Sequence, residues 1–135
     1  MSFVLHAQLA ADTLLVGDLD LCRVLLMNDS QYPWFILVPR RAEIHEIMEL
    51  NDMDRTQLWS ESDWLSRELM RQFKPDKLNM AALGNMVPQL HLHHIARFKN
   101  DPAWPAPVWG KHPAQAYAPE LAQQRLQAMQ AALKR

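Results

Sequence analysis

Residues 89–95 read QLHLHHI and place three of the six histidines of this 135-residue chain within four positions. Imidazole is the side chain whose unperturbed pKa, about 6.5, lies nearest to neutrality. Two imidazoles that face one group can divide the work of group transfer, because one can attack as a neutral nucleophile while the other stabilises the anion that forms. His91 and His93 are therefore the first candidates for chemistry, with Gln89 beside them.

The alternation of side chains along a strand decides which of these residues can act together. On a strand, Gln89, His91 and His93 share one face, whereas His94 points to the other face with two leucines. Residues two apart are separated by about 6.5–7 Å. We therefore expect His91 and His93 to flank one small group, with Gln89 at its edge, and His94 to be structural.

Two other interpretations of the histidines stay open at this point. His-x-His is also a two-ligand metal spacing, and a catalytic zinc site typically takes three protein ligands. A third ligand could come from His45, His112 or an acid, but none stands at a diagnostic spacing. The row could equally be the polar outer face of an edge strand.

The bulk composition limits the class of protein. A chain of 135 residues predicts one domain, residues 1–135. Its net charge of −1 argues against a nucleic-acid partner bound by blanket neutralisation of phosphates. The single Cys22 excludes an intramolecular disulfide. With no secretory signal and no run of about 20 apolar residues, we expect a cytoplasmic protein that has no membrane partner.

Hydrophobic periodicity predicts the elements that position the histidines. Short Leu-, Val- and Ile-rich runs bounded by turn residues predict five antiparallel strands, at residues 13–19, 22–28, 34–40, 77–83 and 89–98. A helix is expected to begin after Asn51 and to end before Pro75, with an apolar stripe made by Leu58, Leu65, Leu69 and Phe73. The fold class is therefore α+β.

The end of the chain has a different composition. Residues 99–119 are rich in proline and tryptophan, and we expect them to form a stiff arm laid across the body or across a dimer partner. Residues 118–135 are expected to form a C-terminal helix.

Two blocks of the sequence resemble the histidine triad (HIT) family. NMAALGNMVPQLHLHHIARF is similar to its signature, His-φ-His-φ-His-φ-φ preceded by a glycine and an amide, and VLLMNDSQYPWFILVPRR resembles its nucleotide-binding strand, loop and strand. The resemblance covers roughly residues 3–100. It implies a five-stranded antiparallel HIT-like sheet, a homodimer, and hydrolysis or transfer at the α-phosphate of a nucleotide or dinucleotide, without a metal or other cofactor.

The resemblance also implies roles for individual residues. His91 matches the nucleophile and His93 the histidine that hydrogen-bonds the phosphate oxygens, while Gln89 stands where the family has its first histidine. The implied nucleotide-binding residues are Asn28, Asn79, Gly84 and Asn85. Met86 replaces a hydroxyl residue of the family, and His45 lies too far along the chain to match its further histidine.

The chemistry of Gln89 bears on whether this protein is an active enzyme or a binding module. Its amide can donate and accept hydrogen bonds but cannot transfer a proton near neutral pH. We expect Gln89 to weaken a proton-transfer step without abolishing attack by His91. The first hypothesis is a HIT-type nucleotide phosphohydrolase or nucleotidyl transferase, and the alternative is a catalytically weak HIT-fold nucleotide-binding module. A metal-dependent hydrolase is the third.

Overall fold

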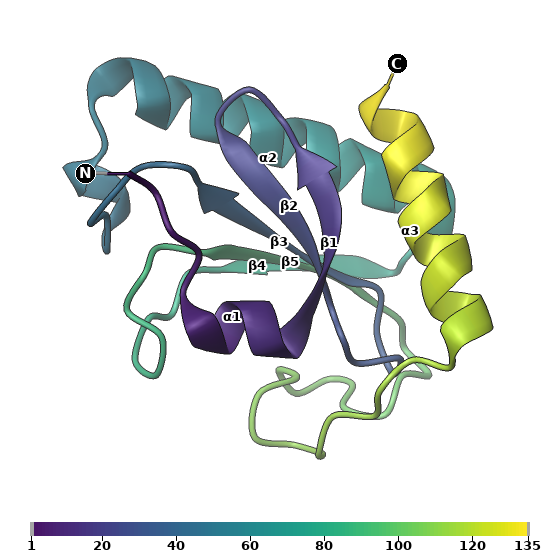
Figure 1. The fold of residues 1–135 in the computed structure, drawn as a ribbon. Helices are drawn as coiled ribbons and strands as arrows, with labels where there is room; N and C mark the ends of the chain where they lie inside the picture. Colours follow the sequence, from purple (N-terminus) through teal and green to yellow (C-terminus); the bar gives the residue numbers. More distant parts are fainter. Residues whose placement is uncertain (1, 135) are drawn as a thin grey trace.

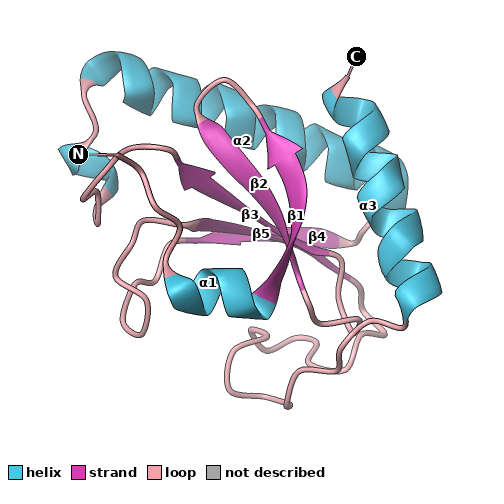
Figure 2. Cartoon of the chain, in the orientation of Figure 1, coloured by secondary structure: helices cyan, strands magenta, loops and turns pink. Residues whose placement is uncertain are grey.

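The computed structural model describes residues 2–134, and in it the chain forms one antiparallel sheet with helices on both faces (Figures 1 and 2). The strands are β1 (Thr13–Asp18), β2 (Cys22–Met27), β3 (Trp34–Pro39), β4 (Lys77–Ala81) and β5 (Leu92–Arg97), in the order β1-β2-β3-β5-β4. The helices are α1 (Ala7–Asp12), α2 (Asp52–Phe73), α3 (Pro119–Leu133) and the short 3-10 helix η1 (Ile47–Glu49). The predicted fold class, with a long helix and a C-terminal helix, is confirmed.

Several element boundaries differ from the sequence prediction. Strand β4 ends two residues before its predicted end, and the other four strands end one residue before theirs. The short helix α1 was not predicted, and the C-terminal helix begins at Pro119, one residue late; Arg135, at its predicted end, lies outside the described residues. Strand β5 begins at Leu92, three residues after Gln89. Leu37 pairs with Leu92, so the position opposite Leu90 is Pro39, which has no N–H to extend the ladder.

Helix α2 lies on one face of the sheet and begins where the sequence indicates. The Asn51 side chain accepts a hydrogen bond from the Asp54 amide at 2.8 Å, which caps the first turn. Leu58, Leu65 and Leu69 are buried against the sheet together with residues of α3. The larger hydrophobic core therefore lies between the sheet and these two helices, as Figure 1 shows.

A second hydrophobic core lies on the opposite face of the sheet. Ile36 and Ile95 of the central strands pack there with Leu9 of α1 and with Ala103 and Val108 of the arm (residues 99–119). The arm is thus laid across the body of its own chain, which was one of the two predicted placements. This face carries the side chain of His93, which stands opposite Ile36 in the β3–β5 ladder.

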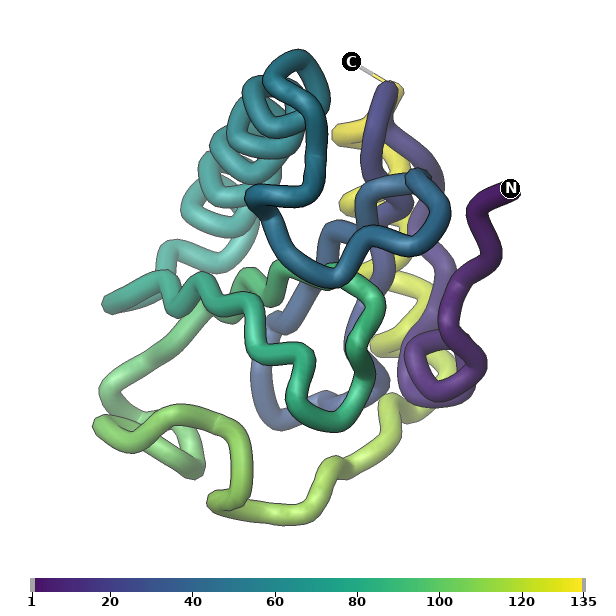
Figure 3. Tube along the Cα trace, turned by 90° about the vertical axis from the view of Figure 1, so that its left-hand side faces the viewer, coloured from purple at the N-terminus to yellow at the C-terminus, as the bar shows by residue number. Residues whose placement is uncertain are grey.

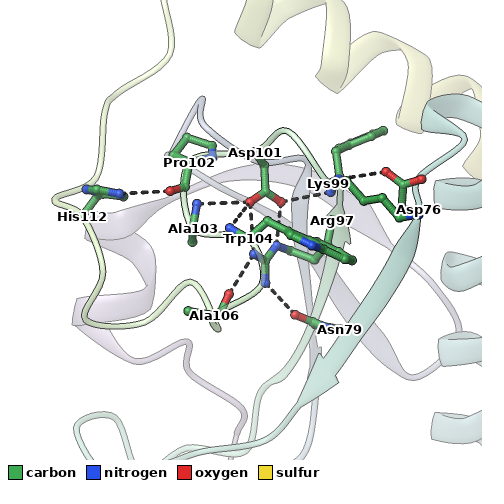
Figure 4. A network of polar contacts seen from close by, with 11 residues as sticks. Asp76, Asn79, Arg97, Lys99, Asp101, Pro102, Ala103, Trp104, Ala106 and His112 are labelled. Carbon is green, nitrogen blue, oxygen red and sulfur yellow. Dashed lines mark hydrogen bonds and ion pairs between the residues drawn. The ribbon is translucent and has the colours of Figure 1, made fainter.

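The arm is held by a buried ion pair at its start (Figure 4). Arg97 and Asp101 form a bidentate pair with N–O distances of 2.8 and 3.1 Å, and their side chains are only 2% and 4% exposed. Arg97 also donates to the Asn79 side chain and to the Ala106 carbonyl, each at 2.8 Å. Asp101 accepts backbone amides as well, including that of Trp104 at 2.8 Å. The pair therefore ties β5, β4 and the arm together.

Within residues 2–134, no helix is both long enough and apolar enough to cross a membrane.

The buried pair makes a prediction about stability. Asp101→Ala leaves the Arg97 guanidinium buried without its carboxylate, so we expect a loss of about 3–5 kcal/mol in the free energy of unfolding. Asp63→Ala is the matched control, because Asp63 forms a solvent-exposed pair with Arg67 at 3.9 Å and should change stability by less than about 1 kcal/mol. Urea unfolding of both variants measures the difference. Equal effects would show that the ion pair does not anchor the arm.

Candidate active site

The two candidate imidazoles stack edge to face at the beginning of β5. The ring centroids of His91 and His93 lie 4.8 Å apart with an interplanar angle of 71°, and the residues are 7% and 3% exposed. Although β5 starts later than predicted, the structure brings this pair together on the face away from α2. Trp109 of the arm packs against the His93 ring with centroids 5.0 Å apart, so the arm forms one wall of the site.

The protonation of His93 follows from its indole partner. Trp34 Nε1 donates to His93 Nδ1 at 3.0 Å, and because an indole N–H only donates, Nδ1 is the bare acceptor. Burial lowers the pKa of His93 to about 3, with smaller contributions from His91 and His94. We therefore assign His93 as neutral with its proton on Nε2, where it can donate to a bound oxygen.

His91 is held in the opposite tautomer. Its Nδ1 lies 2.7 Å from the backbone carbonyl oxygen of Gln89. A carbonyl only accepts, so Nδ1 carries a proton, and in the neutral ring the lone pair is on Nε2. The neighbouring rings therefore offer different groups, a bare nitrogen on His91 and an N–H on His93. That combination can attack an electrophile and stabilise the negative charge that develops beside it.

The side chain of Gln89 contacts the beginning of the chain. Its Oε1 accepts from the backbone N–H of His6 at 2.8 Å, and its Nε2 donates to the backbone carbonyl of Val4 at 2.9 Å. Sequence reasoning placed Gln89 at the edge of the working face but gave no sign of this partner 83 residues away.

His94 lies on the opposite face, as the alternation predicts. Its Nε2 is 2.7 Å from Ser62 Oγ of α2, and its Nδ1 is 3.1 Å from the carbonyl oxygen of Leu92. Burial lowers its pKa to about 4, although the Leu92 carbonyl opposes the shift. His94 is a buried neutral residue that links β5 to α2.

Gly84 and Asn85 lie beside a hollow that reaches the nucleophile candidate. The hollow's inner part is lined by His45, Gly84, Gln89 and His91 among others, and Asn85 lines its adjoining outer part. Gly84 has φ +85°, a conformation that favours glycine. The predicted phosphate-binding turn and His91 are therefore neighbours.

His45, which the sequence offered only as a possible third metal ligand and as a poor match to the family's further histidine, lines the hollow together with His91. The Leu90 N–H donates to the Ile44 carbonyl at 2.9 Å, and this loop-to-loop contact brings His45 into the hollow with His91. No motif spacing signals it, because the two segments meet outside any strand ladder. In Figure 3, residues 82–91 run between the segment after β3 and the N-terminal segment.

Asn28 and Asn79 have other contacts in this structure. The Asn28 side-chain oxygen accepts from the Tyr117 amide at 2.9 Å, and the Asn79 side-chain oxygen accepts from Arg97. The Asn28 oxygen contacts the arm, whereas the Asn79 oxygen contacts Arg97 of β5. Neither residue lines the hollow beside His91. Their nucleotide-binding roles stay predictions.

Among residues 2–134, no group of three or more His, Cys, Asp and Glu side chains is arranged to hold a metal ion.

Comparisons with known proteins agree on one family. The family model described as HIT domain matches residues 8–100, more than half of the chain. A histidine triad protein from Marinobacter aquaeolei is 52% identical, with a TM-score of 0.96 over 99% of this chain and 98% of that one. A histidine triad protein from Bradyrhizobium japonicum is 44% identical, with a TM-score of 0.96 over 98% and 99%. One from Sinorhizobium meliloti is 40% identical, with a TM-score of 0.90 over 98% and 95%. Comparison with curated proteins gives no match.

The two low histidine pKa values predict how stability depends on pH. His93 and His94 stay neutral in the fold down to about pH 3 and 4, whereas in the unfolded chain they take up protons near pH 6.5. The unfolded state therefore binds more protons in this window, and the free energy of unfolding should fall by up to about 1.4 kcal/mol per pH unit for each histidine as pH drops below 6.5.

Urea unfolding at pH 7, 6 and 5 measures this slope. His94→Gln should flatten it relative to the unsubstituted protein, and His112→Gln, on the exposed part of the arm, should not. A slope that His94→Gln leaves unchanged contradicts the assignment of His94 as buried and neutral.

Proposed function

The chain belongs to the HIT-domain family, and on that premise we propose that it is a nucleotide phosphohydrolase or nucleotidyl transferase that acts at an α-phosphate with His91 as its nucleophile. The observation that carries the proposal is the pair of opposite tautomers. His91 presents a bare Nε2, and the adjacent His93 is held as an Nε2–H donor by Trp34.

The proposed reaction has two in-line steps at phosphorus. His91 Nε2 donates its lone pair to the α-phosphorus, the bond from phosphorus to the leaving group breaks, and the leaving group departs with that electron pair and is protonated. The His91 ring becomes positive, and the Gln89 carbonyl that accepts its Nδ1–H stabilises this charge. In the second step the oxygen of water, or of another acceptor, attacks phosphorus, the P–N bond breaks and Nε2 regains its lone pair. The attacking hydroxyl releases its proton to solvent, which balances the proton that the leaving group takes from solvent in the first step.

The surrounding groups suit an anion. The Nε2–H of His93 can donate to a phosphoryl oxygen. The turn at Gly84 and Asn85 lies at the hollow that His91 lines, and its backbone amides are further candidate donors. Asn79 and Asn28 complete the proposed nucleotide site. Their side-chain oxygens accept from Arg97 and from the Tyr117 amide, so their NH₂ groups are the donors proposed for the ligand.

A second candidate function is a nucleotide-binding module with weak catalysis. Two observations favour it: the side chain at the first triad position is occupied by backbone contacts, and His91 is only 7% exposed. Calorimetry with nucleoside monophosphates separates the candidates, because tight binding without turnover of any phosphoramidate or dinucleotide would support the module.

We also propose a homodimer formed through the edge of the sheet. Strand β4 is the outermost strand and is only partly buried, so it exposes unpaired backbone groups. Met80 on this strand and Met70 on α2 are about half exposed, and Ser66 lines the grooves beside both. A two-fold axis perpendicular to β4 would lay this strand antiparallel to its copy and pair these surfaces with their copies.

The activity prediction concerns His91. His91→Ala removes the attacking nitrogen, so we expect kcat/KM for adenosine phosphoramidates or dinucleoside polyphosphates to fall at least about 10³-fold. Chromatography of the released product gives the rate. Mass spectrometry of quenched reactions of the unsubstituted protein should show a nucleotidyl group on His91. His112→Ala is the control, because its exposed ring hydrogen-bonds the Pro102 carbonyl on the arm. Undiminished turnover in His91→Ala would refute the assignment.

The dimer prediction concerns Met80. Met80→Lys places like charges face to face across the proposed two-fold axis, so the variant should sediment as a monomer at concentrations where the unsubstituted protein is a dimer. Met48→Lys, at an exposed methionine on η1, should leave the sedimentation unchanged. A monomeric parent protein, or dimers in both variants, would overturn this interface.

A further inference from the structure

Gln89 joins the beginning of the chain to the nucleophile candidate through three hydrogen bonds. Its side-chain amide contacts the Val4 carbonyl at 2.9 Å and the His6 N–H at 2.8 Å, and its backbone carbonyl accepts from His91 Nδ1 at 2.7 Å. The two backbone groups come from residues two apart, so the primary amide pairs with the segment as a neighbouring strand would. We call residues 3–6 the strap.

The strap has a defined position to which Gln89 can be anchored. Phe3 and Leu5 pack against the second core, and Leu9 of the adjoining α1 is buried in it. His6 then caps α1, its Nδ1 accepting from the Gln8 amide at 3.0 Å. The chain is therefore fixed on both sides of the two contacts with Gln89.

Gln89 itself lies where the main chain lacks a strand partner. It precedes β5, and the ladder with β3 ends at Leu92. The carbonyl that orients His91 is thus outside the sheet. Its peptide unit is held on the Leu90 side, where the Leu90 N–H donates to the Ile44 carbonyl at 2.9 Å, and on the Gln89 side by the contacts of the Gln89 side chain with the strap. Loss of the strap contacts would leave this peptide anchored on the Leu90 side alone, which permits the Gln89 carbonyl to tilt away from His91 Nδ1.

We propose that Gln89 is a positioning residue: by clasping the strap it fixes its own carbonyl, which keeps the His91 proton on Nδ1 and the bare Nε2 in the site. The residue type fits this role, because a primary amide supplies both the donor and the acceptor that the strap requires and does not titrate. A carboxylate at this position could accept from His6 but would face the Val4 carbonyl with a second acceptor.

The clasp is the pair of hydrogen bonds between the Gln89 side chain and the strap. Substitutions in either partner can remove them. Gln89→Ala removes both side-chain contacts. His6→Pro removes only the N–H donor and the imidazole, and the His6 backbone, with φ −55°, suits proline. His6→Ala is the matched control, because it loses the same imidazole cap but keeps the N–H. Gln89→Glu keeps one of the two contacts.

The first readout is the tautomer of His91, measured from its ring ¹⁵N shifts by two-dimensional NMR without any substrate. We expect a proton on Nδ1 in the unsubstituted protein and in His6→Ala, and a mixture of tautomers in Gln89→Ala and His6→Pro, with Gln89→Glu between them. The dispersion of the amide spectrum shows that each variant is folded. If the His91 shifts are the same in all folded variants, the clasp does not position the ring and the proposal is wrong.

The second readout is kinetic and rests on the proposed function. A misdirected nucleophile should lower kcat by about 10- to 100-fold with KM unchanged within about twofold, and the double variant Gln89→Ala/His6→Pro should lose no more than Gln89→Ala alone, because both open one clasp. Additive losses or a change confined to KM would overturn the positioning role. If the tautomers respond but even the unsubstituted protein turns over no nucleotide, the clasp stands and the proposed function fails.

Discussion

Two imidazoles whose ring centroids lie 4.8 Å apart in a buried site cannot both carry a positive charge without a large cost in desolvation and repulsion. The structure meets this constraint by fixing each ring with a partner that permits only one role. The Trp34 indole can only donate to His93, and the Gln89 carbonyl can only accept from His91. In the neutral pair these contacts leave a lone pair on Nε2 of His91 and an N–H on Nε2 of His93, which is the arrangement that attack at phosphorus needs.

The rest of the fold holds these two partners in place. Trp34 begins β3, whose six residues are all buried between the two cores. Trp109, which covers His93, belongs to the arm, and the arm is fixed by the Arg97–Asp101 pair at the end of the same strand that carries the histidines. Gln89 is held by the strap. The site is thus built from the chain's beginning, middle and arm, and each support acts on one of the two rings.

Much of this could be predicted from local pattern. The alternation in QLHLHHI separated His94 from His91 and His93, and the Asn51 cap located the start of α2. The sequence did not predict contacts between distant loops. Gln89 meets a backbone segment 83 residues earlier, and His45 enters the hollow through a single contact between Ile44 and Leu90. Backbone contacts of this kind depend on tertiary packing and leave no periodicity or spacing in the sequence. For the same reason the sequence did not predict that the side-chain oxygen of Asn28 accepts from the Tyr117 amide, or that the side-chain oxygen of Asn79 accepts from Arg97.

If His91 Nε2 is the atom that attacks phosphorus, a bound nucleoside monophosphate must lie against it. A crystal structure of the protein with this ligand should place the α-phosphorus within about 3–3.5 Å of His91 Nε2, with a phosphoryl oxygen hydrogen-bonded to His93 Nε2. A phosphate bound elsewhere on the surface, or one whose phosphorus faces His45 and lies out of reach of His91, would contradict it.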